Sequence, residues 1–168
     1  MKQLLIRRAR QIVITLALCL TAAPTFAGIA DTPLPTLVAG KRTLLVYSVP
    51  GVIASGDLGT FFSCTSTDTA TMQVGVEVFG SAGGGPFNDA AATSLSVGPG
   101  ATVIFGTASS AEISIDSNLG GFFSKGSARI LATSSYLLCT AYIADRFTAP
   151  PSSGWHLTIV KSTKQEGD

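Results

Sequence analysis

The sequence predicts an all-β fold, an antiparallel immunoglobulin-like or Greek-key β-sandwich of about seven to nine strands with one disulfide. Three observations support this prediction. Only 12% of the residues are charged, so the chain has few side chains for the solvent-facing sides of helices. Short β-prone runs alternate with Gly-, Pro- and Ser-rich turns. Two of the three cysteines remain once a predicted signal peptide is removed.

The first 27 residues have the pattern of a signal peptide. Four basic residues and no acid occur in MKQLLIRRAR, and an apolar run follows from about Ile12 to Ala23. This run is shorter than the roughly 20 residues that a membrane helix needs. The alternative, a retained membrane anchor, is therefore disfavoured.

Small residues at positions 25 and 27 precede a predicted cleavage site, so that the mature chain would begin at Gly28. Cys19 does not fit a lipidation site, because the bulky Leu18 precedes it. Cleavage would leave residues 28–168, with seven basic and ten acidic side chains and a net charge of −3. No basic patch remains for nucleic acid. We expect an exported protein, periplasmic or extracellular, with no membrane span after cleavage.

The mature chain has the length of one domain. We predict a flexible proline-bearing arm over 28–39, a β-domain over 40–163 and a polar tail over 164–168. The clearest strand is TMQVGVEVFG (71–80), in which one face carries the apolar side chains of Met72, Val74, Val76 and Val78. Gln73, Gly75 and Glu77 would face water, and Phe79 departs from the alternation.

Two shorter runs occur in SLSVGPGATVIFG (94–106), where Gly98-Pro99-Gly100 predicts a chain reversal between them. The other strand candidates are 43–49, 59–66, 111–115, 127–133, 136–144 and 155–161. No alternation of helical and strand periods, as in a nucleotide-binding fold, is present.

Cys64 in TFFSCTS and Cys139 in YLLCTAY are the two cysteines of the predicted mature chain. An exported chain meets an oxidising environment that joins such a pair. Each cysteine lies in an apolar strand candidate, whereas a reactive thiol needs a positive, partly exposed setting. The sequence therefore predicts a structural disulfide, and Cys139 indicates where the protein resides rather than an activity.

Four stretches in a fixed order carry a resemblance: FFSCTSTDTATMQVGVEVFGSAGG, LSVGPGATVIFGT, GSARILATSSYLLCTAYIADRFTAPP and HLTIVKSTKQEGD. They contain a Cys-Thr after a strand, a valine-rich strand, a Pro-Gly turn, a second cysteine, a Pro-Pro loop and a Lys-rich end. In this order the chain resembles a group of small bacterial secreted all-β proteins without an established function. The resemblance covers most of residues 45–168 and implies a fold, but no activity and no catalytic residues.

No catalytic residue, cofactor or metal ligand is predicted. His156 is the only histidine, which excludes a histidine-cluster metal site and leaves a Ser-His-Asp triad with a single candidate base. Hydrolase signatures such as Gly-x-Ser-x-Gly are missing. SAGGGPFND (81–89) lacks the following helix and Lys-Ser/Thr pair of a phosphate loop, so we interpret it as a flexible loop.

DSNLGG (116–121) resembles the start of a calcium loop. Its fifth position is Gly120 and its twelfth is Ser127, so oxygen ligands are too few, and a turn is the better interpretation. Asp145 and Arg146 follow a strand candidate and are interpreted as a surface turn or ion pair.

Phe122 and Phe123 are neighbours in GGFFSKG, and adjacent side chains of a strand point to opposite faces. One of them is therefore a candidate for an exposed contact, as is Trp155. We predict a secreted, non-catalytic domain with a binding or structural role toward a protein or glycan partner at the cell envelope. The alternative is a carbohydrate-recognition module that uses Trp155 and loop aromatics, and a hydrolytic enzyme that uses His156 ranks third.

Overall fold

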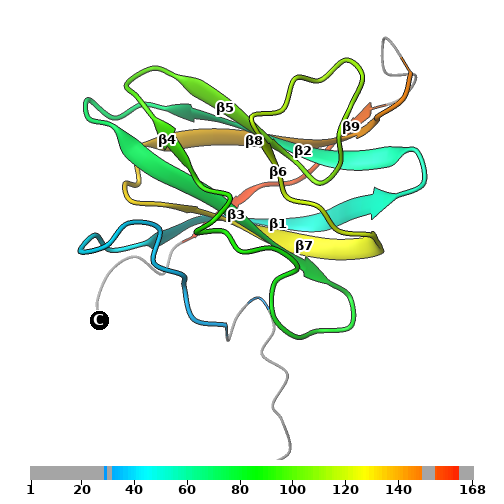
Figure 1. Ribbon diagram of the computed structural model, residues 1–168, viewed down its shortest axis with the longest axis horizontal. Helices are drawn as coiled ribbons and strands as arrows, with labels where there is room; N and C mark the ends of the chain where they lie inside the picture. The colour runs from blue at the N-terminus through cyan, green and yellow to red at the C-terminus, as the bar shows by residue number, and fades with distance from the viewer. Residues whose placement is uncertain (1–28, 30–31, 149–153, 163–168) are drawn as a thin grey trace, which may run out of the picture.

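The structure of the protein is a computed structural model that describes residues 29, 32–148 and 154–162. Ten β-strands and no helix occur in these residues (Figure 1). The strands are β1 (Leu44–Ser55), β2 (Leu58–Ser66), β3 (Met72–Gly80), β4 (Leu95–Val97), β5 (Thr102–Gly106), β6 (Ser117–Asn118), β7 (Phe123–Ala132), β8 (Leu137–Asp145), β9 (Gly154–His156) and β10 (Val160–Lys161). The all-β prediction is confirmed. The predicted signal peptide and the tail over 164–168 lie outside the described residues.

Hydrogen bonds join the ten described strands into one sheet, within which two groups of neighbouring strands can be distinguished. One has the order β4-β3-β7-β1-β10, and the other has the order β6-β5-β2-β8-β9. All pairs are antiparallel except the two-residue pairing of β5 with β6. In the described residues the groups meet where β1 turns into β2, through the pairs Ala54–Gly59 and Ser55–Leu58. Figure 1 shows β2, β5 and β8 in the upper part of the view and β1 and β7 in the lower part.

Strand β1 continues through Pro50-Gly51, beyond the predicted strand over 43–49. The pairing of β1 with β7 shifts register between Pro50 and Val52, and Gly51 has a φ of 81°. A bulge of this kind accommodates a proline inside a strand and bends it. The strand therefore extends to Ser55 and reaches β2.

Two other strand predictions differ from the structure. The predicted strand over 111–115 is wrong, because these residues belong to the loop between β5 and β6. This loop covers the outer face of β2, where Phe61 is buried and Gly106 is so close to Ile115 that a Cβ would lie 2.9 Å from its side chain. The predicted strand over 155–161 is divided into β9 and β10, which pair with different groups.

The main apolar cluster draws side chains from both groups. Its members include Val46, Val49, Phe62, Cys64, Val76, Val78, Phe105, Ile130, Leu137 and Ala141. These residues alternate along their strands with residues of the outer faces, as the pleat requires. A smaller cluster of Leu37, Ala90 and Leu131 lies on the outer side of β3 and β7.

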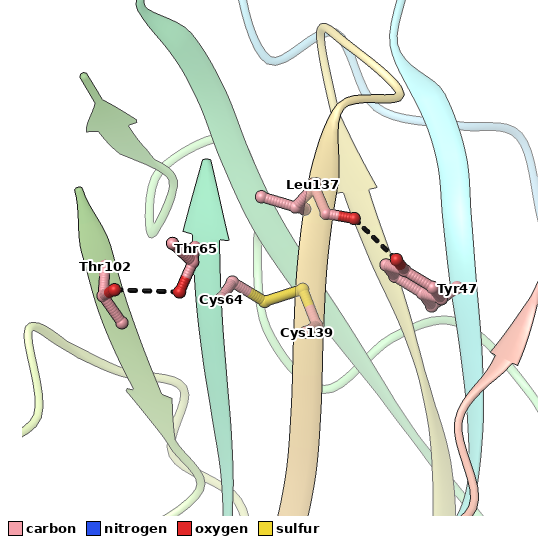
Figure 2. Close-up of a disulfide and its surroundings, with 6 residues drawn as sticks. All are labelled: Tyr47, Cys64, Thr65, Thr102, Leu137 and Cys139. Carbon is pink, nitrogen blue, oxygen red and sulfur yellow. Dashed lines mark hydrogen bonds between the residues drawn. A yellow bond between two sulfur atoms is a disulfide. The ribbon is translucent and has the colours of Figure 1, made fainter. Parts of the chain in front are cut away.

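Cys64 and Cys139 form the predicted disulfide (Figure 2). They are directly opposite each other on β2 and β8, with Cα atoms 4.1 Å apart and 75 positions of sequence between them. Cys64 is fully buried, and Cys139 packs against the same apolar cluster. The disulfide therefore reinforces a pair of neighbouring strands, whereas the disulfide of antibody domains joins two sheets.

Candidate interaction surface

Phe122 and Phe123 are separated by the start of β7. Phe123 begins the strand opposite Ala54, is only 7% exposed and belongs to the main apolar cluster. Phe122 precedes the strand and is 79% exposed. Gly121 has a φ of 105°, and a Cβ there would meet the Phe123 ring at 2.8 Å. The chain thus needs glycine at this position to turn one phenylalanine inward and leave the other in solvent.

Phe87 is a third aromatic residue beside Phe122 and Phe123, and no sequence pattern indicated its role. Its ring stacks on that of Phe123 with centroids 5.2 Å apart, and it remains 55% exposed. The Phe87 amide donates to the Val78 oxygen (2.7 Å), and the Asn88 side chain bonds both Val78 N and Val76 O. This end of the 81–89 loop is therefore fixed to β3, which differs from the expected flexible loop.

Two more exposed aromatic residues lie near the end of β8: Phe147 follows this strand, and Trp155 is on β9, which pairs with it. Trp155 lies opposite Ile143 on the short strand β9 and is 54% exposed. Phe147 is also exposed, and the Arg146 guanidinium lies over its ring at 4.5 Å. The Asp145 carboxylate accepts hydrogen bonds from the amide of Phe147 (2.9 Å) and from Thr148, which fixes the turn. The predicted surface turn at Asp145 and Arg146 is therefore held by the Asp145 carboxylate.

The pairing of the strands places the exposed aromatic residues described above at one end of the domain. That end carries the β1–β2 turn, where Leu58 pairs with both Ser55 and Asp145, and Ala54 pairs with both Gly59 and Phe123. Gly80, which contacts Phe87, pairs with Gly126 near the start of β7. Trp155 pairs with Ile143, which is two residues before Asp145, the partner of Leu58 at this turn. We call this surface the aromatic end, formed by Phe87, Phe122, Phe147 and Trp155.

A cation completes the aromatic end. Arg146 Nε is the buried side-chain polar atom that lacks a hydrogen-bond partner in the described part of the chain. Its main chain is fixed, because Arg146 N donates to Asp57 O and its carbonyl accepts from Ala111 N. The surface therefore combines exposed rings with a positioned guanidinium, groups suited to apolar contact, stacking and hydrogen bonding.

His156 is exposed on β9 and lies opposite Tyr142 of β8. Burial raises the pKa of the Tyr142 phenol. Because the His156 side chain points to the face opposite that of Trp155, these two residues do not form one site. Across residues 29, 32–148 and 154–162, no group of three His, Cys, Asp or Glu side chains is placed to hold a metal ion.

The calcium-like stretch is not the turn interpreted from the sequence, because Ser117–Asn118 form the short strand β6, which pairs with β5. Asp116 accepts a hydrogen bond from Ile104 N (2.7 Å), and Asn118 accepts one from Gly120 N (2.9 Å), so both side chains bind the main chain.

No helix in the described residues has the length and hydropathy of a membrane span. Searches of protein-family models, curated proteins and solved structures found no match to this chain.

Proposed function

We propose that the protein is an exported, non-catalytic β-domain that binds a partner at the cell envelope through its aromatic end. The observation that carries this proposal is the gathering of four exposed aromatic side chains at one end, from four separate segments. Exposed aromatic residues are favoured anchors of interfaces, because each buries a large area at a small entropic cost. Connections at the end of a strand framework are common binding positions.

We further propose that the two strand groups are the layers of a β-sandwich with Greek-key connections. The limited pairing between the groups supports this architecture, as does the position of β7 between β1 and β3, strands distant from it in sequence. In such a fold the aromatic end is one open end of the sandwich. The strands then hold its connections at fixed positions.

Export to the periplasm or the extracellular medium is supported by two features. The first 27 residues have the charge and hydropathy pattern of a signal peptide. The Cys64–Cys139 disulfide is a bond that persists in oxidising compartments. An envelope partner is therefore the expected class of ligand.

Binding of labelled mature protein to native envelope preparations tests the proposal. The variant Phe122→Ser with Trp155→Ser should sediment with the envelope at least about tenfold more weakly, since losing two anchors costs more than 1.4 kcal/mol. The matched control is Tyr136→Ser, an equally exposed aromatic residue in the β7–β8 connection at the opposite end. Equal loss in both variants would contradict a role for the aromatic end.

A carbohydrate-recognition module is the second candidate function. The observation in its favour is the half-exposed Trp155 ring on the short strand β9, because such rings stack on sugar faces. Glycan-array binding that disappears with Trp155→Ala and persists with Phe122→Ser would favour this candidate. Binding to no glycan would leave the partner as a protein.

A further inference from the structure

The outer face of β3 and β7 carries a buried ion pair that was not predicted from the sequence. Glu77 and Arg129 are directly opposite each other in the strand pairing, and their side chains are 3% and 2% exposed. The Arg129 Nε atom donates a hydrogen bond to the Glu77 carboxylate. Their neighbours along the strands face the main apolar cluster, so this pair points to the opposite side.

Both outer nitrogens of Arg129 bind the main chain of the N-terminal arm. Its Nη1 atom donates to the oxygens of Ile29 (3.2 Å) and Thr32 (2.8 Å), and Nη2 donates to the oxygen of Pro33 (3.0 Å). The guanidinium also lies over the Phe79 ring at 5.1 Å. The buried charge is therefore surrounded by one carboxylate, three carbonyls and one ring face.

The arm has the chemistry of a ligand for this site. Pro33 and Pro35 lack N–H groups, so the arm offers carbonyl acceptors and has fewer donors that need a partner. Because proline also fixes φ, the arm loses less conformational entropy when it docks. Leu37 forms a second anchor in the small cluster with Ala90 and Leu131. A Cβ at position 75 would lie 3.0 Å from the Leu37 side chain, so Gly75 makes room for this anchor.

We propose that Arg129 and Glu77 form a binding site for an extended main-chain segment, and that its ligand is the chain's own N-terminal arm. Glu77 orients and neutralises the guanidinium, which presents its outer N–H groups to consecutive carbonyls. The site thus ties Ile29, Thr32 and Pro33 of the arm to the outer side of the sheet. Figure 1 shows the arm in blue on that side, below β1 and β7. The site is independent of the aromatic end.

The test measures protection of the arm in the full mature chain with its disulfide intact. An endoprotease that cuts before aspartate attacks the bond between residues 30 and 31, and the intact mass reports the loss of residues 28–30. A free peptide of residues 28–40 is the unprotected reference. We expect the protein to be cut at least about tenfold more slowly than the peptide, because three hydrogen bonds to a charged group oppose local opening. Equal rates would overturn the proposal.

Variants then assign the protection to the site. Glu77→Leu with Arg129→Met removes both charges while keeping apolar volume, a replacement that buried ion pairs often tolerate. We expect this variant to melt near the wild-type temperature and to lose the protection of the arm. The control Ile130→Val alters the next residue of β7, which faces the main cluster, and should keep the protection. Full protection of the arm in a folded double variant would overturn the proposal. If that variant does not fold, the cleavage rate of the wild-type protein relative to the free peptide still tests the proposal.

Discussion

The phenolic hydroxyl of Tyr47 on β1 donates a hydrogen bond to the main-chain oxygen of Leu137 on β8, across 2.5 Å (Figure 2). This bond links the two strand groups at residues 90 positions apart in sequence. Tyr47 is buried, and its ring belongs to the main apolar cluster. This buried polar contact therefore helps to hold β1 against β8 inside the core.

The first prediction concerns Tyr47→Phe. The variant loses this hydrogen bond, so its free energy of unfolding in urea should fall by about 1–2 kcal/mol. Burial raises the pKa of Tyr47, so the folded state favours the neutral phenol. Wild-type stability should hold below the unfolded tyrosine pKa of about 10 and fall as the pH rises above it. A variant with unchanged stability and the same alkaline fall would show that the contact contributes little.

The second prediction concerns the disulfide. Reduction should lower the free energy of unfolding by about 2–4 kcal/mol, because the bond closes a long loop of the unfolded chain. Thiol labelling without reductant should leave Cys64 and Cys139 unmodified, and the melting temperature should drop when reductant is added. Two readily alkylated thiols in protein purified from the periplasm or the medium would contradict a structural bond.

The third prediction separates the paired phenylalanines. Phe123→Ala should cost about 3–5 kcal/mol, as does removal of other fully packed phenylalanines. Phe122→Ser should change stability by less than about 0.5 kcal/mol, because its side chain is in solvent. Chemical denaturation of both variants provides the measurement. Similar costs at the two positions would be inconsistent with the different burial of the two rings.

The fourth prediction concerns maturation. Intact-mass measurement of the exported protein should give a chain that begins at or near Gly28, since the small residues before it meet the requirement for cleavage. Arg129 would then bind carbonyls that start one residue after the new N-terminus. A full-length chain beginning at Met1 in the membrane fraction would replace cleavage with a retained anchor.

Much of the fold could be predicted from the sequence, because apolar alternation and turn residues are local signals. The valine-rich strand β3, the Gly98–Gly100 reversal and the Cys64–Cys139 pair are examples. The extension of β1 through Pro50-Gly51 could not be predicted, since Pro-Gly also marks turns and the bulge depends on pairing with β7. The strand expected over 111–115 was wrong because alternation does not distinguish a strand from a covering loop.

The candidate surface could be predicted only in part. The alternation rule indicated that one of Phe122 and Phe123 would be exposed, but it did not say which one. Phe87 was missed because its position depends on stacking with a residue far along the chain. Glu77 was expected to face water. A signal was present, since Glu77 and Arg129 are opposite charges, each flanked by apolar residues in its strand, but their pairing depends on register.

Site-specific photo-crosslinking in the native host tests directly whether the aromatic end contacts an envelope partner. A photoreactive amino acid would replace Phe122, Trp155 or, as the control at the opposite end, Tyr136. We expect positions 122 and 155 to give adducts with the same partner, identified by mass spectrometry, and position 136 to give none of that adduct. Adducts that are absent from positions 122 and 155, or equally abundant at position 136, would contradict the claim.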